Sequence, residues 1–405
     1  MIRIYRGEEP ETLAKAREEH LARAELRGVP PGAAELVDYD VARRELFDRH
    51  YDKCAYCEMH LRIEGVPIEH HRPKLRADRV DWTALRTPTA RTDSERAASD
   101  DALFARGLPP SDRERVRWVS DEGYWWLTWT WENQLAACVS CNCAGLKGTR
   151  FPLVRGSSRL TSGEQSPGRE GGAALLIDPT ITDPMEHIRF VYDGRHWRPV
   201  ARDRSAMGAW TITVFDLAGP SLLKPYAVRV RDLEGHARRL DAALSGTPAE
   251  CRAEWEALCD RALYAEAPLL ALTHDWLDQR YPRELRDSWG VTLERPALCL
   301  PGIDRASPPR PAWPPRTELD GLPRELRLRV RVARNAATQT PKAGDPPRSD
   351  QMPLPDLLYE LVKARPATST DLASLLDRSE AYLRDLLRND VRLTLDPTTR
   401  VWRAT

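Results

Sequence analysis

The chain has 405 residues, 41% of them hydrophobic and 30% charged, and its formal net charge is zero. This length is sufficient for two or three domains with their own cores. The neutral balance argues against a protein that coats nucleic acid by bulk charge. No run of about 18 apolar residues is present to span a membrane. The opening stretch, MIRIYRGEEPETLAKAR, also lacks the apolar segment of a signal peptide. We therefore expect a cytoplasmic protein with no membrane partner.

The first third of the chain alternates between helical and extended patterns. Residues 11–50 contain good helix formers and are predicted to be helical. Residues 60–70 read as two short strands, because a glycine and a proline interrupt them. The polar stretch 76–122 is predicted to be a surface insertion. The tryptophan-rich segment YWWLTWTWENQL follows, and its large rings are expected to lie in a core.

The remainder of the chain shows strands, then helices, then a separate C-terminal pattern. A loop over 155–173 precedes two predicted strands joined by an Asp-Gly turn, which is typical of a hairpin. Residues 205–290 read as mostly helical. Prolines crowd 301–350, which predicts a linker with one short ordered piece at LPRELRLRVRV. In 351–405, three short amphipathic helices precede two strands, which is the order of a winged helix-turn-helix.

Cysteine spacing gives the clearest chemical signal. Cys54 and Cys57 form one Cys-x-x-Cys pair, and Cys138 and Cys141 form a second. Four thiolates are what a closed, tetrahedral zinc site requires, so we expect structural zinc. Cys143 is a nearby competitor, although the two-residue spacing favours Cys141. Two unrelated thiol pairs, or a redox switch, are the alternative interpretations.

A Glu-His-His run lies between the two cysteine pairs. The carboxylate of Glu69 suits a hard divalent ion such as magnesium. The imidazole of His70 suits activation of water near neutral pH. His71, its neighbour, stays open as the alternative base. Neighbouring side chains of a regular strand face opposite ways, so Glu69 and His70 would share a site only at a strand end or bend.

Polar residues around the second cysteine pair complete this set. Asn142 directly follows Cys141 and offers a hard carbonyl oxygen. Lys147, a little further along, could contact a phosphate. Asn133 precedes the pair, and an asparagine at such a place often ties a loop through hydrogen bonds to backbone.

The arrangement of these motifs resembles the zinc-stapled HNH endonucleases. It is most similar to the HNH subunit of Septu-type anti-phage defence systems. The stretches that carry the resemblance are CAYCE, IEHHRPK, WENQLAACVSCN, KGTRFPL and LLIDPTITDPMEHIRFVYDG. It covers roughly residues 1–235, whereas the insertion and the C-terminal unit lie outside the usual pattern.

The resemblance implies the fold and the role of each site residue. The fold class would be α+β, with a zinc-stapled ββα-metal nuclease core, surrounding helices and a small C-terminal winged helix-turn-helix. His70 would be the general base, Glu69 and Asn142 would bind Mg²⁺ or Mn²⁺, and Asn133 would hold the loop of the base. The domains would be 1–235 (nuclease, with its core at 50–153), 236–300 (helical extension), 301–350 (linker) and 351–405 (winged helix).

A metal-dependent endonuclease acting on nucleic acid, with DNA as the expected substrate, is therefore the expected function. The alternative is a non-catalytic zinc-ribbon and winged-helix regulator that only binds DNA. Acidic and basic residues are equally frequent over 351–405, whereas a DNA reader usually has a basic face. We therefore expect the C-terminal module to contact protein, either a second copy of the chain or a partner ATPase.

Overall fold

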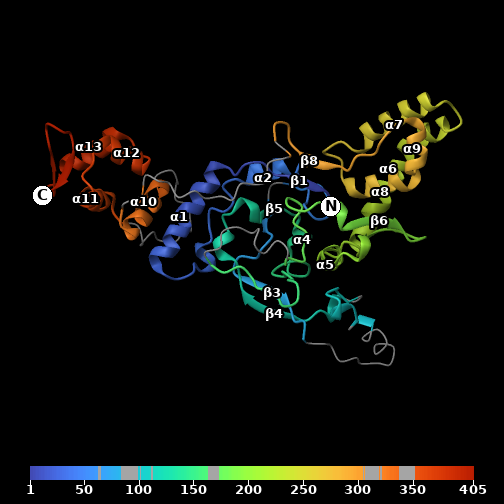
Figure 1. Ribbon diagram of the computed structural model, residues 1–405, viewed down its shortest axis with the longest axis horizontal. Coiled ribbons are helices and arrows are strands. Elements are labelled where there is room, and N and C mark those ends of the chain that lie inside the picture. Colours follow the sequence, from blue (N-terminus) through green and yellow to red (C-terminus); the bar gives the residue numbers. More distant parts are fainter. Residues whose placement is uncertain are drawn as a thin grey trace. The chain divides into compact units, whose positions relative to one another are not determined.

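The computed structural model describes residues 1–62, 65–83, 99–100, 102–110, 113–162, 173–303, 305, 319, 322–336 and 352–405. Contacts within the chain divide it into two compact units. Unit 1 comprises Met1–Glu8, Arg43–Leu127 and Glu132–Arg310, and unit 2 comprises Glu9–Ala42, Thr128–Trp131 and Pro311–Thr405. Helices and small two-stranded sheets make a mixed α+β structure, as expected (Figure 1). In the part of the chain that is described, no helix has the length and apolar character needed to cross a membrane.

The described strands of unit 1 pair in twos. Three pairs are antiparallel: β2 (Ile68–His70) with β5 (Gln134–Ala136), β3 (Arg76–Val80) with β4 (Trp118–Glu122), and β6 (Ile188–Tyr192) with β7 (Trp197–Ala201). A parallel pair joins β1 (Arg3–Tyr5) to β8 (Ala297–Cys299). Strands β3 and β4 bound the predicted insertion, so its two ends form a hairpin-like ribbon.

Helices form most of the second half of unit 1, which confirms the helical prediction for 205–290. They are α5 (Ala206–Val214), α6 (Pro220–Ala243), α7 (Pro248–Ala262), α8 (Leu270–Arg280) and α9 (Arg283–Trp289). Two shorter helices precede them, α2 (Arg43–Arg49) and α4 (Val139–Asn142). The start of α7 shows why such boundaries are readable from sequence. Thr247 and Glu250 form a reciprocal capping box there, and proline occupies the first helical position.

The Asp-Gly hairpin predicted after residue 187 is confirmed. The loop between β6 and β7 contains Gly194 at φ +91°, a left-handed conformation that favours glycine. The carboxylate of Asp193 accepts hydrogen bonds from the backbone of Arg195 at 2.9 Å and His196 at 2.7 Å. These bonds fix the turn and hence the register of the two strands.

The tryptophan-rich segment supplies core residues, as predicted. Trp126, Trp129 and Trp131 are each at most 3% exposed. In unit 2, the Trp129 ring stacks on His20 with centroids 4.5 Å apart, and its Nε1 donates to the carbonyl of Val37 at 2.7 Å. The buried indole N–H therefore has the partner that its burial requires.

Unit 2 contains a long N-terminal helix and a C-terminal group of elements. The elements are α1 (Glu11–Arg27), α10 (Arg324–Ala336), α11 (Leu354–Ala364), α12 (Ser369–Leu376), α13 (Glu380–Asn389) and the antiparallel strands β9 (Leu393–Leu395) and β10 (Trp402–Ala404). The three helices and two strands predicted over 351–405 follow in that order. The ordered piece expected at LPRELRLRVRV is helix α10.

Helix α10 belongs to the hydrophobic core of the C-terminal group. Leu326 and Val330 of α10 share one cluster of buried residues with Leu357 of α11, Leu376 of α12 and Trp402 of β10. Arg334 of α10 also donates to the carbonyl of Leu375. The core that the sequence places within 351–405 is thus completed by a helix from the proline-rich stretch before it.

From the apolar residues of α13, we expect Tyr382, Leu383, Leu386 and Leu387 to pack within the domain. Leu383 and Leu387 are fully buried, and Leu386 lies partly buried against the same core. Tyr382 differs from this expectation, because its side chain is 53% exposed. The helical periodicity explains the difference, since Tyr382 lies on the face away from Leu387. Val391, just after the helix, is 93% exposed.

Candidate metal centre and active site

The two cysteine pairs converge in unit 1. The sulfurs of Cys54, Cys57, Cys138 and Cys141 all lie within 4.8 Å of one another, and those of Cys57 and Cys138 are 3.8 Å apart. Four thiolates bound to a tetrahedral zinc at about 2.3 Å would have sulfurs about 3.8 Å apart. The residues present therefore fit a zinc ion, and the cluster could bind one. Cys143 is not part of the cluster, and its thiol instead donates to the carbonyl of Ser140 at 3.0 Å.

Local backbone structure presents these thiols. Cys54 and Cys57 lie in a tight turn, in which the Glu58 amide donates to the Cys54 carbonyl at 3.0 Å. Glu58 has φ +59°, a left-handed conformation that closes this turn. Cys138 caps α4, and its sulfur accepts a hydrogen bond from the Cys141 amide at 3.3 Å. Both pairs are thus arranged by short turns that point two sulfurs the same way.

Hydrogen bonds within the cluster favour a negative charge on one sulfur, that of Cys138, and raise the pKa of the Cys57 and Cys141 thiols. Contacts from the thiols of Cys141, Cys54 and Cys57 hold the pKa of the Cys138 thiol far below its ordinary value. The thiolate is the form that binds metal, so this sulfur is prepared for a cation.

Two strands and a short helix carry the predicted catalytic groups, in the chain order strand, strand, helix. His70 ends β2 opposite Gln134 of β5, and Glu69 lies opposite Leu135. Asn142 ends α4, directly after Cys141. Glu69 is 2% and His70 is 5% exposed, whereas Asn142 is half-buried. The cysteine cluster therefore joins the turn of Cys54 and Cys57 to α4, and β2 connects to the same region through its pairing with β5.

Glu69 has a partner that the sequence did not indicate. Its carboxylate forms an ion pair with Lys147, and both side chains are almost fully buried. Lys147 also donates to the carbonyl of His70 at 2.7 Å. Burial raises the pKa of Glu69 and lowers that of Lys147, and the attraction between the two charges opposes both changes. The expectation that Lys147 contacts a phosphate is wrong, because Lys147 is 1% exposed and its ammonium contacts Glu69 and the His70 carbonyl of β2 instead.

Asn133 holds the loop that follows the histidines. Its amide Nδ2 donates to the carbonyls of Arg72 at 3.1 Å and Leu127 at 3.2 Å, and its Oδ1 accepts from the Arg72 amide at 2.8 Å. The Asn133 carbonyl accepts a further bond from the His71 amide at 2.9 Å. Asn133 is fully buried, so these bonds connect β2 and β5 without competition from water.

His71 lies deeper than His70. It is 1% exposed, and its ring meets the Phe151 ring edge-on with centroids 5.4 Å apart. Burial lowers the pKa of His71 to about 3, although the charge of Asp178 opposes this. Burial raises the pKa of Asp178 in turn, but His71, Arg6 and hydrogen bonds from Thr180 outweigh it and leave that pKa lowered. A neutral His71 and an ionised Asp178 are thus buried next to β2.

The donors for a second cation are oxygen atoms only. A Glu69 carboxylate and an Asn142 carbonyl suit Mg²⁺, which commonly keeps several waters and uses one or two protein ligands plus substrate phosphates. In the described residues, the four cysteines form the one group of three or more His, Cys, Asp and Glu whose ligand atoms lie this close together. An ion bound by Glu69 would have to replace the contact of this carboxylate with Lys147.

Sequence reasoning missed Asp178 and Arg6, and it missed the pairing of Lys147 with Glu69. Asp178, Arg6 and Lys147 are almost fully buried and charged, and their roles depend on tertiary contacts. The stretch IDPT gave one usable signal, because an aspartate before proline and threonine commonly forms a local turn. Asp178 forms such a turn with Thr180, at 2.7 Å to its hydroxyl.

Comparison with known proteins supports a relation to Septu proteins. The chain is 27% identical over 184 residues to the Septu protein PtuB of Bacillus mycoides (strain KBAB4). The alignment covers 45% of this chain, and the chain spans about half of that relative, 48% of its length. No family model matches the chain, and no solved structure matches it. The chain is thus similar over part of its length to a Septu protein, and four of its cysteines could bind zinc.

Proposed function

We propose that this chain is a metal-dependent endonuclease of the HNH type. The observation that carries the proposal is the strand–strand–helix arrangement tied by four cysteines, with His70 at the end of β2 and Asn142 at the end of α4. A zinc ribbon that only binds DNA would need the cysteines but not Glu69, His70 and Asn142. In an HNH nuclease, each of these three residues would have a role in cleavage.

His70 would act as the general base. It would take a proton from a water molecule that attacks a phosphodiester in line. The bond from Lys147 to the His70 carbonyl and the Asn133 contacts fix the backbone around this residue. His71 suits the role less well, because a base with a pKa of about 3 holds a proton poorly near neutral pH.

Glu69 and Asn142 would hold the divalent ion. When bound, Mg²⁺ or Mn²⁺ would supply charge stabilisation for the phosphorane and for the leaving 3′ oxygen. The zinc of the cysteine cluster would be structural only, because four thiolates leave it no open position.

An anti-phage role is proposed from the same comparison. The relative is named a Septu protein, and the sequence resembles the HNH subunit of such defence systems. We infer DNA as the substrate class and a partner ATPase or a second copy of the chain as the protein partner. The α11–α13 helices and the β9–β10 strands would form a winged helix that contacts protein. Several of its basic groups are already paired: Lys363 with Glu360, Arg384 with Glu380, and Arg392 with Asp390 and Asp356.

Selective removal of the weakly held ion tests the proposal. The full chain is incubated with plasmid DNA and, separately, with RNA in the presence of Mg²⁺ or Mn²⁺. EDTA is then added at a concentration that leaves the zinc content unchanged, as measured by metal analysis. Cleavage is expected to stop and to return when the ion is restored. Cleavage that survives with only zinc bound, or intact nucleic acid with every ion, would contradict the proposal.

A further inference from the structure

A small cavity lies beside the candidate site and has no role in the proposed chemistry. Its volume is about 180 Å³, and four separate stretches of unit 1 contribute to its wall. The lining residues are Glu114, Val116, Trp118, Gly145, Arg150, Thr213 and Val214. Pockets for drug-sized ligands begin at about 300 Å³, so this cavity suits one small ring system.

The chain that forms one wall leads directly from the candidate metal ligands. Gly145 is three residues after Asn142, so the two Cα atoms are at most about 11 Å apart. Further along, Arg150 forms a parallel bridge with Asp78 of β3 and is therefore extended. Neighbouring side chains of extended backbone face opposite ways. Accordingly, Phe151 contacts the His71 ring, whereas Arg150 lines the cavity.

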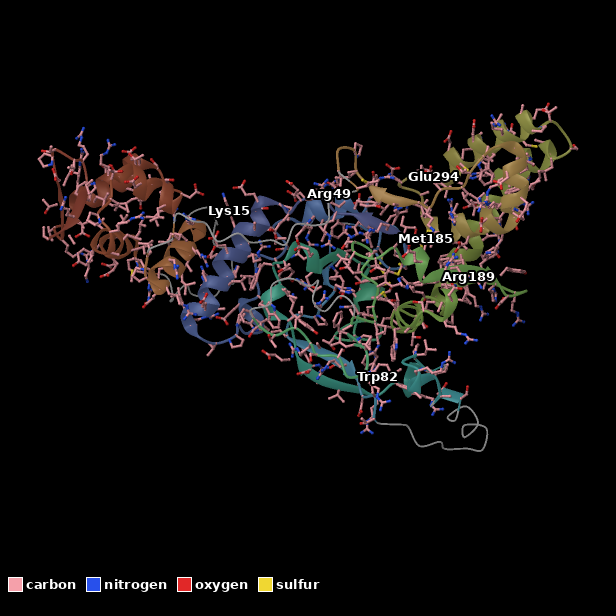
Figure 2. All side chains as sticks on the ribbon, in the orientation of Figure 1. Lys15, Arg49, Trp82, Met185, Arg189 and Glu294 are labelled. Carbon is pink, nitrogen blue, oxygen red and sulfur yellow. The ribbon has the colours of Figure 1, made fainter. Side chains whose placement is uncertain are left out.

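The cavity has an aromatic wall that is already held in place. The Arg150 guanidinium lies 5.5 Å from the centre of the Trp118 ring and also donates to the Gly145 carbonyl at 3.0 Å. Trp118 in turn meets Trp210 of α5, with centroids 6.2 Å apart. Trp210 contacts Trp82, which is labelled in Figure 2, at 5.7 Å. Such support keeps the half-buried Trp118 from collapsing into the cavity.

The remaining walls favour a flat ring over a bare phosphate, because two valines are apolar and the carboxylate of Glu114 opposes the charge of Arg150. Val116 and Val214 are buried and apolar, so they favour a planar group of low polarity. Thr213 offers a hydroxyl to the edge of such a ring. Glu114 offers a carboxylate, which accepts hydrogen bonds from ring N–H and amino groups but repels an anion.

We propose that this cavity, formed by Trp118, Arg150, Glu114 and Thr213, binds one unpaired nucleobase next to the site of cleavage. This inference rests on the proposed nuclease function and names the substrate class more closely: DNA or RNA with an unpaired or extruded nucleotide. A base inside a duplex cannot reach such a cavity unless it leaves the stack. The cavity would therefore select nucleic acid that contains an unpaired or extruded nucleotide over a fully paired duplex.

Binding without cleavage tests this inference. The full chain, in EDTA, is titrated by fluorescence anisotropy against a paired DNA duplex and against the same duplex with one bulged adenine; matched RNA duplexes form a second arm. Stacking of one base on an aromatic side chain gives about 1–3 kcal/mol, so about tenfold tighter binding of the bulged duplex is expected. The arm with the larger preference identifies the nucleic acid. Replacing the adenine by 2-aminopurine should give a fluorescence change on binding that reports its transfer into the cavity.

Variants test whether the preference for the bulged duplex arises at the cavity. Trp118→Ala should remove this preference, and Trp118→Phe should keep part of it. Tyr264→Ala changes an exposed aromatic residue outside the cavity and should leave the preference unchanged. Thr213→Met fills the cavity and leaves the aromatic cluster intact, so it should also remove the preference for the bulged duplex. This second variant tests the inference even if Trp118→Ala folds poorly. Equal affinity for both duplexes, or a preference that survives Trp118→Ala and Thr213→Met, overturns the inference. If the chain prefers the bulged duplex but cleaves nothing with any ion, only the nuclease proposal is contradicted. If it cleaves nucleic acid but shows no preference for the bulged duplex, only the inference about the cavity is contradicted.

Discussion

At the scale of single residues, two buried histidines make stability sensitive to acid. Burial lowers the pKa of both His50 and His71 from 6.5 to about 3. Below pH 6.5 the unfolded chain therefore binds protons that the folded chain does not, and stability falls as the pH drops toward 3. The slope approaches about 1.4 kcal/mol per pH unit for each histidine.

This prediction is checked by urea unfolding at pH 7 and pH 5. Between these values, His50→Gln should lose about 2 kcal/mol less stability than the wild type, because one proton-binding step of the unfolded state is removed. His60→Gln, at an exposed position, should follow the wild type. Zinc content is followed in parallel, so that loss of metal in acid is not mistaken for this effect. Equal losses in the His50→Gln and wild-type proteins would show that burial of His50 does not govern acid stability.

Two asparagines should separate stability from activity. Asn133 is fully buried with three side-chain hydrogen bonds to backbone, so Asn133→Ala leaves those groups without partners and should cost about 3 kcal/mol. Asn142 is half-buried, so Asn142→Ala should unfold within about 0.5 kcal/mol of the wild type while losing cleavage. Denaturant unfolding and nuclease assays on both variants make the comparison. The reverse pattern, a stable Asn133→Ala and an active Asn142→Ala, would contradict both roles.

At the scale of elements, the cysteine cluster should hold β2, β5 and α4 together. Cys138→Ser removes one ligand and the cap of α4, so it should release zinc and lower the melting temperature; Cys54→Ser should do the same. Cys143→Ser is the matched control, because that thiol lies outside the cluster. Metal analysis and thermal unfolding measure both effects. A Cys138→Ser protein that keeps zinc and melts like the wild type would refute the structural role.

The elements also show which features a sequence can predict. Local signals were sufficient where one short stretch decides the structure: the Asp193–Gly194 hairpin and the two cysteine turns. Contacts between distant stretches were not readable in the same way. Nothing near Lys147 in the sequence indicates that it pairs with Glu69, and α10 looks like part of a linker until its apolar face meets α11.

The cysteine cluster itself was predictable although its pairs lie far apart. Each pair has the spacing of a metal-binding turn, and two such turns together supply the ligands of one zinc ion. The nuclease assignment depends on a resemblance in the same region, and the alignment with the Septu relative covers less than half of this chain. For the helices outside this region, the sequence offered only their hydrophobic pattern, which predicts helices but not how they pack.

At the scale of the whole molecule, unit 2 should assemble with protein. Tyr382 and Val391 are exposed on its C-terminal group, while nearby arginines are paired with carboxylates. Replacing both with serine should reduce self-association, or assembly with a co-expressed partner ATPase, and leave nucleic acid affinity within about twofold. The two-residue change is preferable to deleting 351–405, because that deletion would expose the core face of α10.

Sedimentation and anisotropy measurements make this comparison. Tyr264→Ser in unit 1 is the control for loss of an exposed aromatic side chain. A large loss of nucleic acid binding with assembly intact would show that the C-terminal group reads nucleic acid instead.

The proposed function depends above all on His70 as the base of phosphodiester cleavage. This role is tested by the initial cleavage rate of His70→Ala beside His71→Ala, each in Mn²⁺ and each verified as folded and zinc-bound. We expect His70→Ala to lose at least about a hundredfold in rate, the usual contribution of a general base, while a folded His71→Ala protein keeps most of the wild-type rate. Full activity of His70→Ala, with or without loss in His71→Ala, would contradict it.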